Sequence, residues 1–63
     1  MTLNDLFNLV GESQKTVLIE KDGGLKISGT LDSLSAMLND AVFSESVVDI
    51  EARADELWVW IEE

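Results

Sequence analysis

The chain has 63 residues, of which 13 are acidic and 4 are basic, so its formal net charge is -9, and it contains no histidine or cysteine. We expect one domain over residues 1–63, and a domain of this size buries only about 60% of the surface that its unfolded chain exposes. The missing cysteines exclude a disulfide framework and a thiolate metal site. The charge disfavours direct binding to nucleic acid or to an anionic membrane, and it favours a basic partner, although solubility alone would also explain it.

The apolar segments are short. No run approaches the ~20 residues of a membrane span, and the start, Met-Thr-Leu-Asn-Asp, lacks the basic region of a secretory signal. We therefore expect no membrane partner and a cytoplasmic location.

The first half of the chain predicts a helix followed by a hairpin. Thr2 and Asp5 have the spacing of a capping box, apolar residues follow at helical spacing as far as Val10, and Gly11 is a natural helix end. Residues 16–20 and 25–30 read as two strands. The turn between them, residues 21–24, holds two glycines that permit a positive φ.

The second half repeats this order. Thr30 or Asp32 caps a predicted helix whose apolar stripe extends to Val42, and residues 43–46 end it. Residues 47–52 and 57–61 form a second pair of strands, joined by residues 53–56. The predicted fold is therefore α+β in the order α-β-β-α-β-β, with a four-stranded, mainly antiparallel sheet and two helices packed on one face.

Alternation along the strands predicts which side chains face the helices. The expected core consists of Leu3, Leu6, Phe7, Val10, Val17, Ile19, Leu25, Ile27, Leu31, Leu34, Leu38, Val48, Ile50, Leu57, Val59 and Ile61. The helix-free face would then carry Leu18, Lys26, Ser28, Val47, Asp49, Glu51, Trp58 and Trp60.

The closing segment Leu57–Ile61 is an unbroken apolar run that contains both tryptophans. If Leu57, Val59 and Ile61 line the core, the two indoles lie on the opposite face and need a partner or a cover. Two alternatives remain at this point. A register shifted by one residue would bury the tryptophans and expose Val59, or the two indoles merely shield each other.

Catalytic chemistry is hard to place on this chain. Without histidine, cysteine or tyrosine, a general base would have to be a lysine or a buried carboxylate. Asp49 and Glu51 share a strand face, but alternating acids of this kind are typical of a solvated surface. The segment from Asp22 to Gly24 lacks the ligand spacing of a calcium loop and the ending of a phosphate loop. We expect no enzyme activity and no catalytic, cofactor-binding or metal-binding residues.

Interaction with a protein is the remaining class. In the first hypothesis the carboxylates imitate nucleic-acid phosphates and bind a basic nucleic-acid-binding protein, with the tryptophans as anchors. In the second, the chain is a structural homodimer that uses the tryptophan-bearing face or the last strand as its interface. The residues predicted to contact a partner are Trp58, Trp60, Leu18, Val47, Asp49 and Glu51.

The overall style of the chain resembles the uncharacterised small acidic proteins encoded by phages and prophages of Gram-positive bacteria. The stretches that carry this resemblance are Thr2 to Val10, Lys21 to Gly24, Gly29 to Leu34 and Val47 to Ile61. The opening Asn4-Asp5-Leu6 is also similar to the start of an anti-CRISPR inhibitor that imitates nucleic acid. The resemblance implies a phage or mobile-element origin and a role directed at a host protein in the host cytoplasm, and it transfers no site residue.

Overall fold

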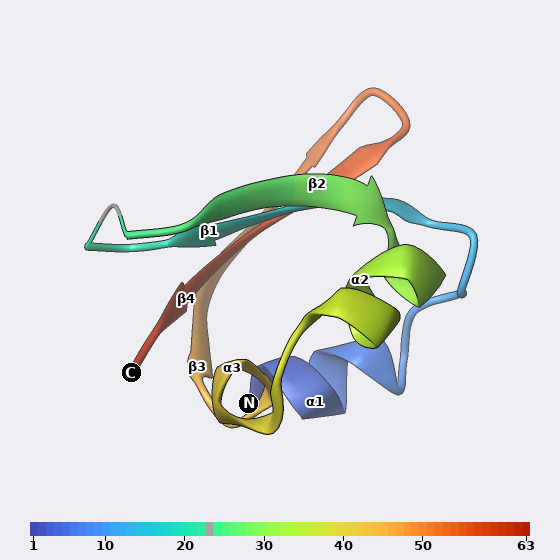
Figure 1. Cartoon of the computed structure of the whole chain (residues 1–63). Coiled ribbons are helices and arrows are strands. Elements are labelled where there is room, and N and C mark those ends of the chain that lie inside the picture. The colour runs from blue at the N-terminus through green and yellow to red at the C-terminus, as the bar shows by residue number, and fades with distance from the viewer. Residues whose placement is uncertain (23) are drawn as a thin grey trace.

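The computed structural model describes residues 1–22 and 24–63. Three helices and four strands follow one another in the order α1 Leu3–Phe7, β1 Lys15–Glu20, β2 Lys26–Thr30, α2 Leu31–Met37, α3 Asp40–Phe43, β3 Ser46–Arg53 and β4 Glu56–Glu62 (Figure 1). None of the helices in these described ranges is long and apolar enough to cross a membrane.

The strands form a single mixed sheet in the order β2-β1-β4-β3. Each hairpin is antiparallel, whereas the two central strands, β1 and β4, run parallel to each other. The sheet curves around the helices, which lie on its concave side (Figure 1). The α+β class and the packing of the helices on one face are thus confirmed, while the order has a third helix and the central pairing is not antiparallel.

Side-chain caps set the helix starts. The Thr2 hydroxyl accepts a hydrogen bond from the Asp5 amide at 3.2 Å, and the Asp5 carboxylate accepts one from the Thr2 amide at 3.1 Å, as the capping-box spacing predicted. These bonds lower the pKa of Asp5. The helix ends at Phe7, whereas the apolar spacing predicted that it extends to Val10. Residues 8–10 lie outside the helix, in a turn and bend.

The predicted second helix is divided into α2 and α3. Leu38 adopts an extended conformation with φ -83° and ψ 147°, which ends α2. The Asn39 side chain then accepts a hydrogen bond from the Val42 amide at 3.2 Å and starts α3. The prediction of one continuous helix to Val42 is wrong because an N-cap residue lies inside the apolar stripe.

The core lies between the concave side of the sheet and the helices. The sheet contributes Leu18, Val59 and Ile61, each with 0% of its surface exposed. The helices contribute the buried residues Leu3, Leu6, Phe7, Leu31 and Leu34. The rings of Phe7 and Phe43 meet edge to face with centroids 5.5 Å apart, which joins α1 to α3.

The predicted facing of β1 is wrong. Leu18 pairs with Val59 of β4 and lies in the core, so its neighbours Val17 and Ile19 point to the helix-free face. Val17 is nevertheless buried and Ile19 half-buried, because β1 is a central strand with a neighbour on each side. A parallel central strand that is covered on both faces reads as a continuous apolar run, which removes the alternation needed to assign its faces.

A bulge changes the facing of β3. The register shifts between Val47 and Asp49, so Val47 pairs with Ile61 and packs against the core, although it was predicted on the helix-free face. Val48 and Ile50, which were predicted in the core, are both 43% exposed. Ile50 pairs with Val59 and therefore faces the concave side, but β3 is an edge strand.

A short turn joins the two strands of each hairpin. In the first, the Asp22 side chain accepts a hydrogen bond from the Gly24 amide at 3.2 Å, and Gly23, one of the two glycines that permit a positive φ, lies outside the described residues. In the second, Ala54 has a φ of 55°. Left-handed backbone is the geometry that tight antiparallel hairpins need, and an alanine adopts it at a cost of about 1 kcal/mol.

Candidate protein-interaction surfaces

Trp58 and Trp60 lie on the side of the sheet opposite the helices, which we call the tryptophan face. Their ring centroids are 6.1 Å apart and the ring planes are tilted by 37°. Both residues are half-buried, whereas Val59 between them is fully buried in the core. The alternative register, with the tryptophans in the core and Val59 outside, is therefore wrong.

Two basic side chains cover the indole of Trp58. The Arg53 guanidinium carbon lies 4.1 Å from its ring centroid and 5.7 Å from that of Trp60, and the Lys26 ammonium lies 5.3 Å from the Trp58 centroid. These are cation–π distances. Arg53 also donates from Nε and Nη2 to one carboxylate oxygen of Glu51, at 3.0 and 2.7 Å. Of the two acids beside the indoles, Asp49 and Glu51, Glu51 is thus compensated within the face.

The other two basic residues also pair with acids of the strands and turns of the sheet. Lys15 contacts Asp55 at 2.9 Å, and this contact raises the pKa of the lysine and lowers that of the carboxyl. Lys21 contacts Glu62 at 3.7 Å. All four basic side chains of the chain are therefore engaged by a carboxylate or an indole of the sheet.

The helices and the loop after α1 carry the opposite charge pattern. Asp5, Asp32 and Asp40 lie in the first turns of α1, α2 and α3, and Glu12 lies next to the start of α2, where its carbonyl accepts from the Asp32 amide at 3.0 Å. All four are exposed. Since every basic residue is on the sheet or its first turn, these acids have no basic side chain among the described residues, although the N-terminal ammonium lies near Asp5.

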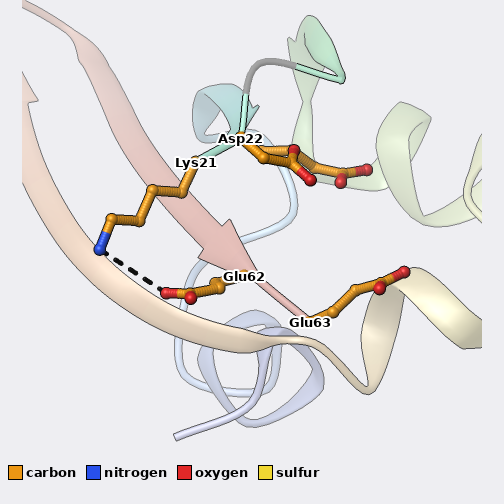
Figure 2. Close-up of a pocket in the computed structure, with 5 residues that line it drawn as sticks. Lys21, Asp22, Glu62 and Glu63 are labelled. Carbon is orange, nitrogen blue, oxygen red and sulfur yellow. Dashed lines mark ion pairs between the residues drawn. The ribbon is translucent and has the colours of Figure 1, made fainter.

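A second group of acids surrounds a pocket at the end of the sheet where the chain finishes. The pocket has a volume of about 430 Å³ and is lined by Glu20, Lys21, Asp22, Glu62 and Glu63. Figure 2 shows the Lys21–Glu62 ion pair on one side of it, while the side chains of Asp22 and Glu63 point to the other side.

Glu45 lies next to this group at the start of β3. Continuing the β3–β4 register by one residue from the Ser46–Glu62 pair sets Glu45 opposite Glu63, on the concave side of the sheet. Its side chain is buried, with only 8% of the residue exposed, and its Oε1 has no hydrogen-bond partner among the described residues. Burial raises the pKa of Glu45, and the nearby charges of Glu20, Glu63 and Asp22 raise it further.

The structure brings together four of the six residues predicted to contact a partner. Trp58, Trp60, Asp49 and Glu51 share the tryptophan face, because Asp49 pairs with Trp60 and Glu51 with Trp58. Leu18 and Val47 do not belong to it, since Leu18 is fully buried in the core and Val47 packs against the core.

Sequence reasoning missed Arg53 and Glu45. Arg53 follows Glu51 by two residues, the spacing that puts two strand side chains on one face. This spacing could have predicted that Arg53 pairs with the Glu51 carboxylate. No comparable signal marks Glu45, because its burial depends on where α1 and β4 meet β3.

Within residues 1–22 and 24–63, no group of three or more acidic side chains is placed to hold a metal ion. Comparisons of the chain with protein-family models, with curated proteins and with solved structures find no match.

Proposed function

We propose that this chain is a non-enzymatic acidic interaction protein that binds a basic protein partner, encoded by a phage or another mobile element and acting in the host cytoplasm. The observation that supports it best is the separation of charge over the surface. The sheet and its first turn hold all four basic residues in local pairs, and the helical side holds exposed acids without a basic side chain among the described residues.

This separation has a physical consequence for association. Paired charges on the tryptophan face cancel over a few ångströms, whereas unpaired carboxylates of one sign add to a field that reaches about 8 Å at physiological salt. Such a field attracts a positive surface and raises the association rate. A groove that binds nucleic-acid phosphates is a positive surface of this kind, so the most specific form of the proposal is a nucleic-acid mimic that occupies it.

The test is affinity capture with the immobilised protein from a bacterial lysate, followed by identification of the bound protein and repetition at rising salt. We expect a basic nucleic-acid-binding protein whose capture falls steeply between about 50 and 500 mM salt. We also expect added nucleic acid to displace it. A captured partner that is neutral or acidic, or a complex that is indifferent to salt, would refute the proposal.

A homodimer through the tryptophan face is the second candidate. It is favoured by the compensation of Glu51 by Arg53, which removes part of the repulsion that two copies of an acidic face would otherwise experience. Half-buried tryptophans in the middle of such a face are typical anchors of an interface. Light scattering would then give twice the mass of 7.0 kDa, and Trp60→Ala would reduce it. A monomer at high micromolar concentration would exclude this candidate.

A further inference from the structure

The outer edge of β3 is covered only at its start. β3 is the last strand of the sheet, and its one neighbouring strand is β4. At the start of β3 the N-terminal residues pair with this edge in antiparallel fashion, because Thr2 bridges Ser46 and the Val47 amide donates to the Met1 carbonyl at 2.8 Å. Residues 48–53 are all exposed, and no other segment of the described ranges pairs with their edge. An extended segment thus pairs with one part of the edge, and the rest is open.

The backbone of the open part directs donors and acceptors outward. Residues of an antiparallel strand point their backbone groups alternately to one side and the other. The β3–β4 hairpin has a two-residue loop and closes on the pair Arg53–Glu56, so the backbone groups of Arg53 point to β4. Those of Ala52 point outward by this alternation, and so do those of Ile50. The Ile50 amide fits this direction, because it donates to the Asp49 carboxylate at 2.9 Å. That carboxylate serves as the acceptor that an added strand would otherwise supply.

The two sides of this edge differ in their side chains. On the tryptophan face the edge carries Asp49 and Glu51, and Asp49 has no ion pair with a basic side chain among the described residues. On the concave side it carries Ala52 and Ile50, and Ile50 is 43% exposed. Side chains directly opposite each other on neighbouring strands share a face. The edge therefore fits a strand that has basic residues on the first side and apolar residues on the second.

We propose that the outer edge of β3 from Asp49 to Arg53 binds an extended segment of the basic partner, as an added antiparallel strand in which basic and apolar residues alternate. This inference rests on the proposed function and identifies one of its contacts. A carbonyl of the partner would replace the Asp49 carboxylate at the Ile50 amide, and the freed carboxylate would pair with a basic side chain opposite it. In this mode of recognition the backbone hydrogen bonds give affinity and the alternate side chains give specificity.

A second copy of the chain fits this edge less well. If residues 49–53 paired with the same residues of a second copy, Glu51 would lie opposite its own equivalent, and like charges in that position are destabilising. Arg53 would lie opposite Asp49, but its guanidinium is engaged by Glu51 and by the indole of Trp58. Each copy would also bring a net charge of -9 to the interface. The charges therefore favour a basic segment over a second copy.

The experiment is a titration of the ¹⁵N-labelled protein, followed by amide chemical shifts and hydrogen exchange. The probe is an acetylated and amidated heptapeptide, Lys-Val-Lys-Val-Lys-Val-Lys, and the same peptide with glutamate in place of lysine is the charge control. We expect saturable shifts over residues 49–53 and slower exchange of the Ile50 and Ala52 amides with the lysine peptide. We expect neither effect with the glutamate peptide.

Two N-methylated forms of the lysine peptide separate strand addition from attraction of charge alone. The valines would lie opposite Ile50 and Ala52, so their backbone groups would face β3, whereas those of the lysines would face away. Methylation of the valine amides should weaken the binding at least about tenfold, because it removes the donors to β3. Methylation of the lysine amides keeps these donors and should weaken the binding much less.

Two substitutions test the contribution of the protein. Ala52→Pro removes an outward amide, which an edge strand tolerates without loss of its pairing to β4, and should abolish the binding. Asp49→Asn keeps an acceptor for the Ile50 amide and removes the charge, so it should weaken the binding about threefold. Asp32→Asn makes the same charge change on α2 and, as the matched control, should leave the binding unaltered. If Ala52→Pro does not fold, the two methylated peptides decide.

Equal binding of the two methylated peptides, or shifts that spread over all acids without saturation, would overturn the inference. Protection of the Ile50 and Ala52 amides that rises with protein concentration in the absence of peptide would also overturn it, because a second copy would then occupy the edge. Since this titration needs no partner, a negative result leaves the capture experiment standing, and a positive one does not depend on it.

Discussion

The two faces of the sheet are stabilised in different ways. On the concave side, Leu18, Val59 and Ile61 are fully buried beneath the helices, and Glu45 at the open end of this side is buried near other acids. On the tryptophan face the two indoles are half-buried, and each exposed cation is engaged by an acid or an indole. Burial of apolar surface supports the first face, while aromatic contacts and local charge compensation support the second.

This difference separates folding from binding. An apolar side chain that is completely buried is available only to the fold, and a compensated charge contributes little to the field outside. The surface available to a partner includes the uncompensated carboxylates and the exposed parts of the two indoles. Substitutions on either face test this contrast.

The largest effect is expected from truncation on the concave side. Leu18→Ala leaves a cavity in the core and should reduce the free energy of unfolding by about 2–5 kcal/mol, whereas Ile19→Ala, one residue along and half-buried on the other face, should cost less than half as much. Urea unfolding followed by tryptophan fluorescence measures both. An Ile19 cost larger than that of Leu18 would restore the facing that alternation predicted.

A smaller effect is expected from the cation on the tryptophan face. Arg53→Ala removes the guanidinium that stacks on Trp58 and binds Glu51, and should reduce stability by about 0.5–1 kcal/mol. Arg53→Lys keeps the charge but not the planar fork, so it should recover only part of the loss. The indole emission should shift to longer wavelength in Arg53→Ala. Unchanged emission and stability in both variants would show that Arg53 does not cover the indoles in solution.

The smallest effect is expected in the pH dependence of stability that Glu45 causes. The pKa of Glu45 is raised above its ordinary value of 4.5, so between these two values the folded state binds more protons than the unfolded state. Ionised Glu45 therefore lowers stability near neutrality, and this contribution disappears as the pH falls through the raised pKa.

Glu45→Gln should consequently be more stable than the unaltered chain at pH 7, with the difference shrinking toward pH 4.5. Thermal unfolding over this range measures it, and Asp32→Asn, an exposed acid, is the matched control. A variant that is less stable at pH 7 would mean that Glu45 has a compensating partner.

Much of the fold could be predicted from local signals. The Thr2 and Asp5 cap, the two hairpins and the α+β class follow from spacing, propensity and turn residues, which act over a few positions. The facing of Leu18 could not be assigned by alternation, because a central strand is buried on both sides. The unbroken runs at 17–19 and 57–61 do indicate two central strands, and this reading would have predicted that they are neighbours.

The candidate surfaces were harder to predict. The alternation of side chains along the last strand predicted that Trp58 and Trp60 lie on the helix-free face, and the structure places both there. Val47 was misplaced because the bulge beside it depends on how the edge strand meets β4. The acids of the pocket come from two separate segments, residues 20–22 and 62–63, so their proximity depends on the parallel pairing of β1 with β4, which no local pattern contains.

The most direct test of the central claim compares two triple variants with equal charge change, once the basic partner has been identified by capture. One neutralises the helical side, with Glu12→Gln, Asp32→Asn and Asp40→Asn; the other neutralises the sheet side at the three acids that pair with a cation, with Glu51→Gln, Asp55→Asn and Glu62→Gln.

Isothermal titration with the partner gives the affinity of each variant. We expect the helical-side variant to bind at least about tenfold more weakly than the sheet-side variant, since only the former removes uncompensated charge. Equal losses in the two variants, or a greater loss in the sheet-side variant, would contradict the account.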